Sequence, residues 1–268
     1  MHVSLGDIER ESYMKSPIHR LDGWIKIIIT LLMVVYTVSL PRAETANFIK
    51  LGILELYLLS SMIVARLDLS YLALRFAMAL PFGLGIAVIQ PFFRQSFFTD
   101  FTVLYSLTPG LEITKEGLIF GAILFAKFFV CISSVILLSS TTSMSELVAS
   151  ARRLGLPREM ALLFTMMVRY LFVFWNMLGR IRTAQKTRCF NIWNKKVPRK
   201  WTLEQVGYTI SSLFIRSYEQ GERTYQSMLC RGYNAEVPVY IGKKYLSFTD
   251  VLVLLLTISI IAVAQVAL

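Results

Sequence analysis

The chain has 268 residues, of which 55% are hydrophobic and 13% aromatic. This apolar share exceeds the roughly 45–50% that is typical of a soluble domain. Several apolar runs approach the ~18 to 20 residues that a helix needs to cross a bilayer core. An ordinary soluble protein is therefore excluded, and a multi-pass membrane protein is predicted.

Five apolar segments are predicted to cross the membrane as helices. They are residues 24–40, 48–65, 69–93, 117–140 and 248–268. The third contains Pro81, which membrane helices tolerate because neighbouring groups can satisfy the freed backbone. We therefore expect an all-α fold, a polytopic membrane protein with about five transmembrane helices, in the cell membrane.

The charge of the chain is concentrated in residues 141–246. This segment contains seventeen Lys or Arg and six Glu, and the difference of +11 equals the net charge of the whole chain. Basic residues beside membrane spans are retained in the cytoplasm, so this segment and the N-terminus are predicted to be cytoplasmic. The expected organisation is residues 1–140 with four spans, a cytoplasmic region at 141–246 and a last span at 247–268.

Long helices are predicted in the cytoplasmic region. Ser143 and Glu146 form the N-terminal signature of a first helix that ends at Gly155. Apolar residues at helical spacing predict a second helix over 157–190 and a third over 202–231, with a turn at 195–200 between them and Gly232 as a C-cap.

The second and third helices close on similar sequences. RCFN begins at Arg188 and RGYN begins at Arg231, 43 positions later (231 − 188). A cation at a helix C-terminus is favoured by the helix dipole, which explains one such arginine but not the repetition. Two similar helix ends suggest two similar partner grooves, such as those of a two-fold ATPase dimer. The chain has no Walker A motif of its own, so any nucleotide hydrolysis is expected on another subunit.

These motifs resemble those of one transporter family. Thr187-Arg188-Cys189 and Cys230-Arg231-Gly232 are similar to the two Ala-Arg-Gly-like motifs of the transmembrane T component of energy-coupling-factor (ECF) transporters. ARRLGLP at 151–157 and SPIHRLDGWIKI at 16–27 resemble the same family, and the latter resembles its cobalt or nickel branch, known as CbiQ.

The resemblance implies a non-catalytic subunit with defined partners. Its coupling helices would dock through the six motif residues on two ATP-binding-cassette ATPases, identical or different, which bind ATP and Mg²⁺. A separate membrane subunit, the S component, would bind the cobalt or nickel substrate. No cofactor or metal is expected on this chain. Only His2 and His19 could supply the imidazole that such metals favour, and both precede the first span.

An apolar, Met-rich face of the second cytoplasmic helix is the candidate contact with the substrate subunit. Its residues are Leu162, Leu163, Met166, Met167, Tyr170, Phe174 and Met177. Methionine adapts its shape to a moving partner. Ordinary packing on the chain's own spans is an equally good interpretation of the same face.

Three further features leave alternatives open. Glu55 and Lys127 fall inside predicted spans, where they are expected to pair with each other or to take part in a conduction path. Arg75 is expected to extend to the cytoplasmic surface. Cys189 and Cys230 are interpreted as small packed residues in preference to a metal pair, because no CxxC spacing accompanies them.

Three other functions are alternatives to the transporter. A T component for a vitamin is the nearest alternative. A membrane-anchored protein that binds nucleic acid or ribosomes would use the basic segment, but its aromatic residues follow helical spacing and do not form stacking platforms. A membrane-embedded enzyme is disfavoured because no catalytic motif is visible. The expected surroundings are therefore protein subunits and the lipid bilayer, without nucleic acid.

Overall fold

The chain folds into two compact units. The computed structural model describes residues 16–41, 46–92, 103–108, 111–192, 197–234 and 248–266. Unit 1 comprises Met1–Leu154 and Lys244–Leu268, and unit 2 comprises Gly155–Lys243. The predicted boundary at 140 therefore lies inside unit 1, which continues to Leu154. The predicted boundary at 246 lies two residues after Lys244, where unit 1 resumes.

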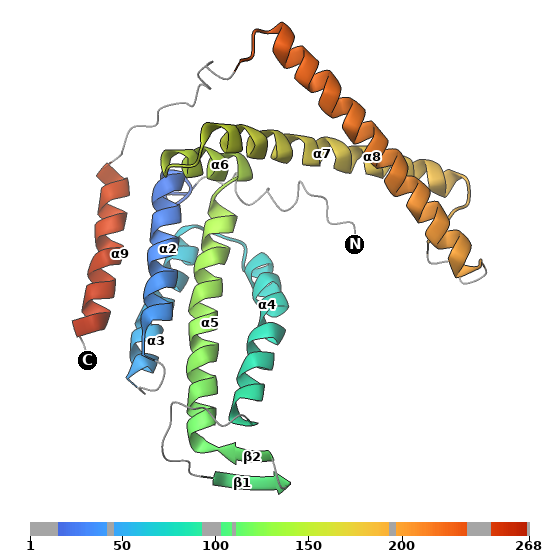
Figure 1. Cartoon of the computed structure of the whole chain (residues 1–268). Helices are drawn as coiled ribbons and strands as arrows, with labels where there is room; N and C mark the ends of the chain where they lie inside the picture. The colour runs from blue at the N-terminus through green and yellow to red at the C-terminus, as the bar shows by residue number, and fades with distance from the viewer. Residues whose placement is uncertain are drawn as a thin grey trace. The chain divides into compact units, whose positions relative to one another are not determined.

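Unit 1 is a bundle of apolar helices (Figure 1). Its elements are α2 (Gly23–Ser39), α3 (Asn47–Val64), α4 (Leu69–Ile89), η2 (Gln90–Phe92), α5 (Lys115–Thr141), α6 (Met144–Arg153) and α9 (Phe248–Val266). Helix α5 packs against α2, α3 and α4, while α9 packs on α2 and α3. Each of the five predicted spans corresponds to one of these helices, with ends that differ by a few residues.

The interior of the bundle is made by apolar side chains from three helices. Met33 of α2, Leu51, Leu54 and Leu58 of α3 and Val130 of α5 belong to one buried cluster. Other apolar side chains of the bundle are exposed on the protein surface, among them Leu31, Leu56 and Ile63, which is the arrangement expected of helices whose outer faces contact lipid.

Two glycines set the close packing of α4 on α5. A Cβ atom at Gly83 would lie 2.5 Å from the Phe128 ring, and one at Gly121 would lie 2.7 Å from the carbonyl oxygen of Ala87. Small residues of this kind allow membrane helices to approach closely. Helix α4 also runs continuously through Pro81, as the sequence predicts.

Length and composition place one unexpected helix among the candidate spans. Of the described helices, α3, α4, α5, α7 and α9 are long and apolar enough to cross a membrane, whereas α2, with 17 residues, is a shorter apolar helix. Helix α7 (Arg158–Thr187) qualifies because residues 160–178 contain a single charged residue, Arg169, in an otherwise largely apolar run. It differs from the others in belonging to unit 2, where it pairs with α8.

A small hairpin is the exception to an otherwise helical fold. Strands β1 (Val103–Thr108) and β2 (Leu111–Thr114) pair antiparallel, with Val103 opposite Thr114. The strand sequences VLYSLT and LEIT favour extended structure, and Pro109-Gly110 between them in the sequence is a common turn pair. The sequence analysis assigned no strands between the third and fourth predicted spans, where this hairpin lies.

Two ionisable side chains inside the bundle, Lys127 and Glu55, make hydrogen bonds between elements. Lys127 donates from Nζ to the carbonyl oxygen of Leu40 at 2.7 Å, and Ser133 donates to Oε1 of Glu55 at 2.7 Å. Both interactions join α5 to an earlier element, so each polar group adds a link between elements of the bundle. Arg75 does not simply extend outward, because its guanidinium donates to the hydroxyls of Ser139 and Ser140 on α5 at 2.5 and 3.1 Å.

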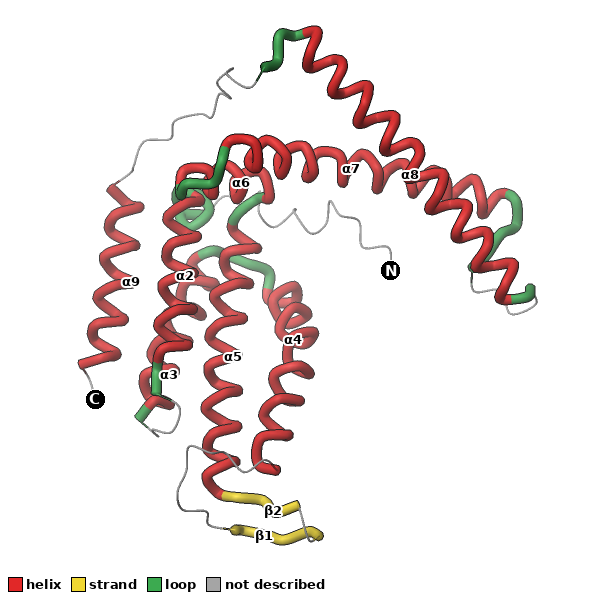
Figure 2. The backbone as a smooth tube through the Cα atoms, in the orientation of Figure 1, coloured by secondary structure: helices red, strands yellow, loops and turns green. Residues whose placement is uncertain are grey.

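Unit 2 consists of two long helices, α7 and α8 (Arg199–Cys230), seen as red tubes in Figure 2. Tyr170 and Thr224 share a hydrogen bond of 2.6 Å, and Gln185 donates to Thr209 at 2.6 Å. From the first bond to the second, the residue number rises from 170 to 185 on α7 and falls from 224 to 209 on α8. The two helices therefore run antiparallel. Helix α8 begins at Arg199, so Arg199 and Lys200 belong to it and not to the predicted turn.

Candidate functional site

The end of α7 is a well-defined turn around Arg188. Arg188 is the C-cap residue, and the next residue, Cys189, has a φ of +58°. The N–H of Cys189 donates to the carbonyl of Lys186 at 3.0 Å, and that of Phe190 donates to the carbonyl of Gln185 at 3.0 Å. These two bonds define a Schellman motif, in which the residue after the cap adopts the left-handed conformation.

The end of α8 repeats this turn around Arg231. Arg231 is the C-cap residue and Gly232 has a φ of +77°. The N–H of Gly232 donates to Leu229 at 2.9 Å, and that of Tyr233 donates to Met228 at 3.0 Å. The hydrogen bonds at the two ends therefore correspond one for one, and the predicted role of Gly232 in ending the helix is confirmed.

Both arginines are exposed beside a half-buried aromatic residue. Arg188 and Arg231 lie on the surface, whereas Phe190 and Tyr233 are partly covered, and the Phe190 ring packs edge-on against Trp201 at 5.6 Å. The aromatic residue fixes the turn while the guanidinium is free to reach a partner. The terminal carbonyls of a helix carry partial negative charge, so each cation also stabilises its helix end.

The helix pairing sets the distance between the two arginines. In the antiparallel register, Arg188 lies near residue 206 of α8, which is 25 residues before Arg231. At 1.5 Å per residue, the two helix ends are about 37 Å apart. They are thus two separate attachment points and not one composite site.

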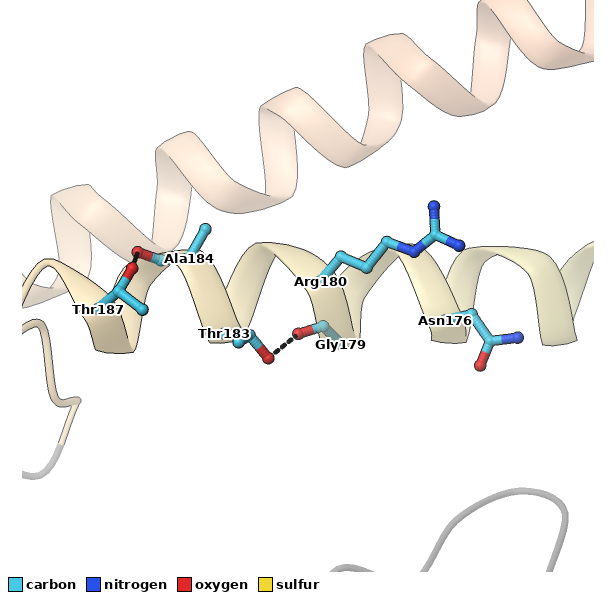
Figure 3. Close-up of a pocket in the computed structure, with 6 residues that line it drawn as sticks. All are labelled: Asn176, Gly179, Arg180, Thr183, Ala184 and Thr187. Atoms are coloured by element: carbon cyan, nitrogen blue, oxygen red, sulfur yellow. Dashed lines mark hydrogen bonds between the residues drawn. The ribbon is translucent and has the colours of Figure 1, made fainter.

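A shallow groove leads along α7 to its Arg188 end (Figure 3). It has a volume of about 670 Å³ and is lined by Asn176, Gly179, Arg180, Thr183, Ala184 and Thr187. Thr183 and Thr187 donate their hydroxyls to backbone carbonyls of α7 at 3.0 and 2.8 Å. The small side chains leave room for a partner side chain next to the helix end.

The predicted apolar face of α7 is divided between two environments. Leu163 and Met167 are exposed, at 60% and 57%. Tyr170 bonds to Thr224 of α8 and stacks on Phe174 at 6.0 Å, and Met177 lines a cleft with residues of α8. Leu162 and Met166 are half-buried. Part of this face therefore serves the pairing of α7 with α8.

A second apolar surface on α8 was missed by the sequence analysis. Its residues share one side of the helix and are 58% to 71% exposed; they are Leu203, Ile210, Phe214, Tyr218 and Tyr225. Their spacing of seven, four, four and seven residues is a helical period that the sequence already contains. The α8 apolar face lies about 100° around the helix from the side that bears Thr209 and Thr224, at 100° per residue.

The cysteines of the repeated motifs are free thiols. Cys189 and Cys230 are exposed, and Cys131 of α5 is half-buried. Cys189 follows the end of α7 and Cys230 is the last residue of α8, so the two thiols lie at opposite ends of the helix pair. They are too far apart to bind one metal ion together. Among the described residues, no group of three or more potential metal ligands occurs.

The sequence matches a known family over most of its length. Residues 14–241 match the family described as cobalt transport protein, CbiQ. An uncharacterised protein of Methanocaldococcus jannaschii is 30% identical over 154 residues, 58% of this chain and 51% of that protein. A putative fused cobalt transport protein, CbiMQ, of Methanocorpusculum labreanum is 26% identical over 230 residues, 82% of this chain and 35% of the relative.

A relative with an ECF name matches as well. The energy-coupling factor transporter transmembrane protein EcfT of Listeria innocua is 31% identical over 172 residues, 57% of this chain and 63% of that protein. A second uncharacterised protein of Methanocaldococcus jannaschii is 30% identical over 132 residues, and the chain spans about half the length of both proteins from this organism. The chain belongs to the CbiQ family of cobalt transport proteins.

Proposed function

We propose that this chain is the energy-coupling subunit of an ECF importer, with α7 and α8 as its cytoplasmic coupling helices. The helix ends at Arg188 and Arg231 dock on two ATPase subunits, and the movement of those subunits passes through this chain to a separate substrate-binding membrane subunit. The repeated Schellman turn supports the proposal most strongly, because two copies of one helix ending suit two copies of one groove.

The chemistry of arginine suits such a docking role. The guanidinium carries five N–H donors in a fixed fork and keeps its charge at any physiological pH. Carboxylates and backbone carbonyls in a groove would accept these donors. A hydrogen bond that involves a charged group contributes about 1.5–3 kcal/mol, so the loss of one arginine is expected to weaken docking about 10- to 100-fold.

The separation of the two ends suggests how movement is transmitted. When ATP binding draws two grooves together, attachment points about 37 Å apart on one helix pair must follow by sliding or turning α7 on α8. The α8 apolar face and the exposed part of the α7 face then contact the substrate-binding subunit. Met167 in this contact adapts to a changing surface.

The division of labour places ATP, Mg²⁺ and the transported substrate on other subunits. The chain lacks a Walker A sequence, and its only histidines are His2 and His19. The family description and the name of the fused relative favour cobalt, or nickel, as the substrate of the assembly. Comparing uptake of Co²⁺, Ni²⁺ and vitamins by the complete complex in vesicles decides between a metal and a vitamin.

Co-purification tests the docking assignment. Tagged chain is isolated from membranes with its ATPases, comparing wild type, Arg188→Ala, Arg231→Ala and the double variant. Arg182→Ala on α7 and Arg223→Ala on α8 serve as controls, because both are exposed arginines within the helix bodies. We expect the ATPases to be lost from the double variant and retained by both controls. Retention by the double variant, inserted in normal amount, would reject the assignment.

A further inference from the structure

A network of buried polar groups joins four elements at one end of unit 1. Asp22 precedes α2 and its Oδ2 accepts from Nη1 of Arg153, the last residue of α6, at 2.5 Å. The Asp22 side chain is 6% exposed and that of Arg153 is 27% exposed. An ion pair this sheltered is screened much less by water and salt than a surface pair.

The same aspartate also contacts α9. The backbone N–H of Asp22 donates to Oδ1 of Asp250 at 3.3 Å, and Asp250, in the first turn of α9, is buried. One turn further along α2, Lys26 donates from Nζ to the carbonyl of Thr141, the last residue of α5, at 2.9 Å. Residues at the start of α2 thus hold the ends of α5, α6 and α9 together.

Close packing holds α6 against α2 at this place. A Cβ atom at Gly23 would lie 2.4 Å from Oγ of Ser150 on α6, so no side chain fits between the two helices. Ser150 is buried in this contact. The Asp22–Arg153 pair therefore closes an interface that is already in van der Waals contact.

These residues lie where the chain passes between the two units. The first part of unit 1 ends at Leu154, the residue that follows Arg153. The second part begins at Lys244, six residues before Asp250. Gly155, the first residue of unit 2, has a φ of +107°. In the sequence, one connection follows α6, whose Arg153 pairs with Asp22, and the other precedes α9, whose Asp250 accepts from the Asp22 N–H.

We propose that Asp22 is a positioning residue for energy coupling, because it anchors both connections from the coupling helices to the membrane bundle. This inference rests on the proposed function. Force that enters unit 1 through α6 and α9 moves the bundle only if both helix ends are held to α2. Without the anchor, the ATPases still dock and hydrolyse ATP, but less of the movement reaches the bundle.

The test measures coupling separately from folding and docking. The complete complex is reconstituted in vesicles with wild-type chain, Asp22→Asn, Arg153→Met or both changes, and Co²⁺ uptake is divided by ATP hydrolysed. The double variant is the main one, because it removes both charges of the pair together and so releases α6 from α2, while the bond from the Asp22 backbone N–H to Asp250 is kept. Arg223→Ala is the control, since its pair with Glu219 is exposed and joins two positions of α8.

We expect the double variant to retain bound ATPase and to lose at least about tenfold in uptake per ATP, while the control remains unchanged. A merely structural role would lower protein amount, docking and uptake together and would leave uptake per ATP hydrolysed unchanged. Wild-type uptake per ATP in the double variant would therefore overturn the inference.

A second measurement keeps the inference testable if the double variant does not fold. Arg153→Lys retains the charge but lacks the planar fork that reaches Asp22. Hydrogen exchange of the α6 amides in the intact complex is expected to rise at least about fivefold in this variant, and unchanged exchange contradicts the anchor. If wild type itself takes up no Co²⁺, the proposed substrate fails, and the exchange comparison alone decides the anchor.

Discussion

Cys189 and Gly232 occupy the same position in two copies of one helix ending, with φ angles of +58° and +77°. In each copy the residue before it is a C-cap arginine and the residue after it donates its N–H back to the last turn. Gly adopts this conformation without steric cost, whereas a residue with a Cβ is strained there by roughly 1–2 kcal/mol. The α7 ending therefore has the same turn geometry as the α8 ending although its residue at this position is less suited to it.

The strain predicts opposite effects of substitution at the two ends. Gly232→Ala is expected to destabilise the α8 turn by about 1 kcal/mol and to raise hydrogen exchange at the Tyr233 amide about fivefold. Cys189→Gly is expected to lower exchange at Phe190 by a similar factor. Gly221→Ala is the control, because a Cβ there meets no other described atom within 4 Å and Gly221 lies inside α8. Equal exchange in Gly232→Ala and wild type would contradict this account.

The packing of α4 on α5 predicts a specific sensitivity at Gly83. Gly83→Ala places a methyl group 2.5 Å from the Phe128 ring, and overpacking of this kind typically costs 1–3 kcal/mol. We expect a lower apparent melting temperature of the purified protein in detergent. Gly85→Ala, where the described structure leaves space for a Cβ, should melt like wild type. If both variants melt alike, α4 does not pack on α5 through Gly83.

The α8 apolar face predicts a loss of the substrate subunit without a loss of the ATPases. Phe214→Asn removes the 70%-exposed aromatic side chain at the centre of this face. Truncating a central aromatic contact commonly costs 2 kcal/mol or more, so co-purified substrate subunit should fall by about 30-fold or more. Ser212→Asn is the control, because residue 212 lies on a different side of α8. Unchanged recovery with Phe214→Asn would place the contact elsewhere.

Much of the membrane part follows from the sequence, because apolar length is a strong signal. The five predicted spans correspond to α2, α3, α4, α5 and α9. The capping pair is confirmed as well, since Ser143 accepts from the N–H of Glu146 at 3.3 Å at the start of α6. Helix α7 shows the limit of this signal, because its composition equals that of a span.

The less predictable features depend on contacts between distant residues. Asp22 and Arg153 are 131 positions apart, and a single sequence gives no information on such pairing. The left-handed conformation of Cys189 was also hidden, because Gly, not Cys, is the usual residue there. The α8 apolar face differs from these features, since its helical period is visible in the sequence and could have been predicted from it.

The sites named for the ATPases and for the substrate subunit remain predictions. The structure shows that the two helix ends have equivalent hydrogen bonds, which a repeated sequence motif alone does not establish. Glu55 accepts from Ser133 and Lys127 donates to the carbonyl of Leu40, and the conduction role considered for Glu55 and Lys127 stays a prediction.

The most direct test of the central claim uses the two cysteines that adjoin the arginines. Cys189 and Cys230 are exposed thiols and can carry a thiol-linked photo-crosslinker in the intact complex, with Cys131→Ser removing the third thiol. We predict that both positions crosslink to ATPase subunits, and that Arg188→Ala and Arg231→Ala each abolish only the crosslink at their own end. Crosslinking at neither position, with the ATPases still bound, would contradict docking through the paired helix ends.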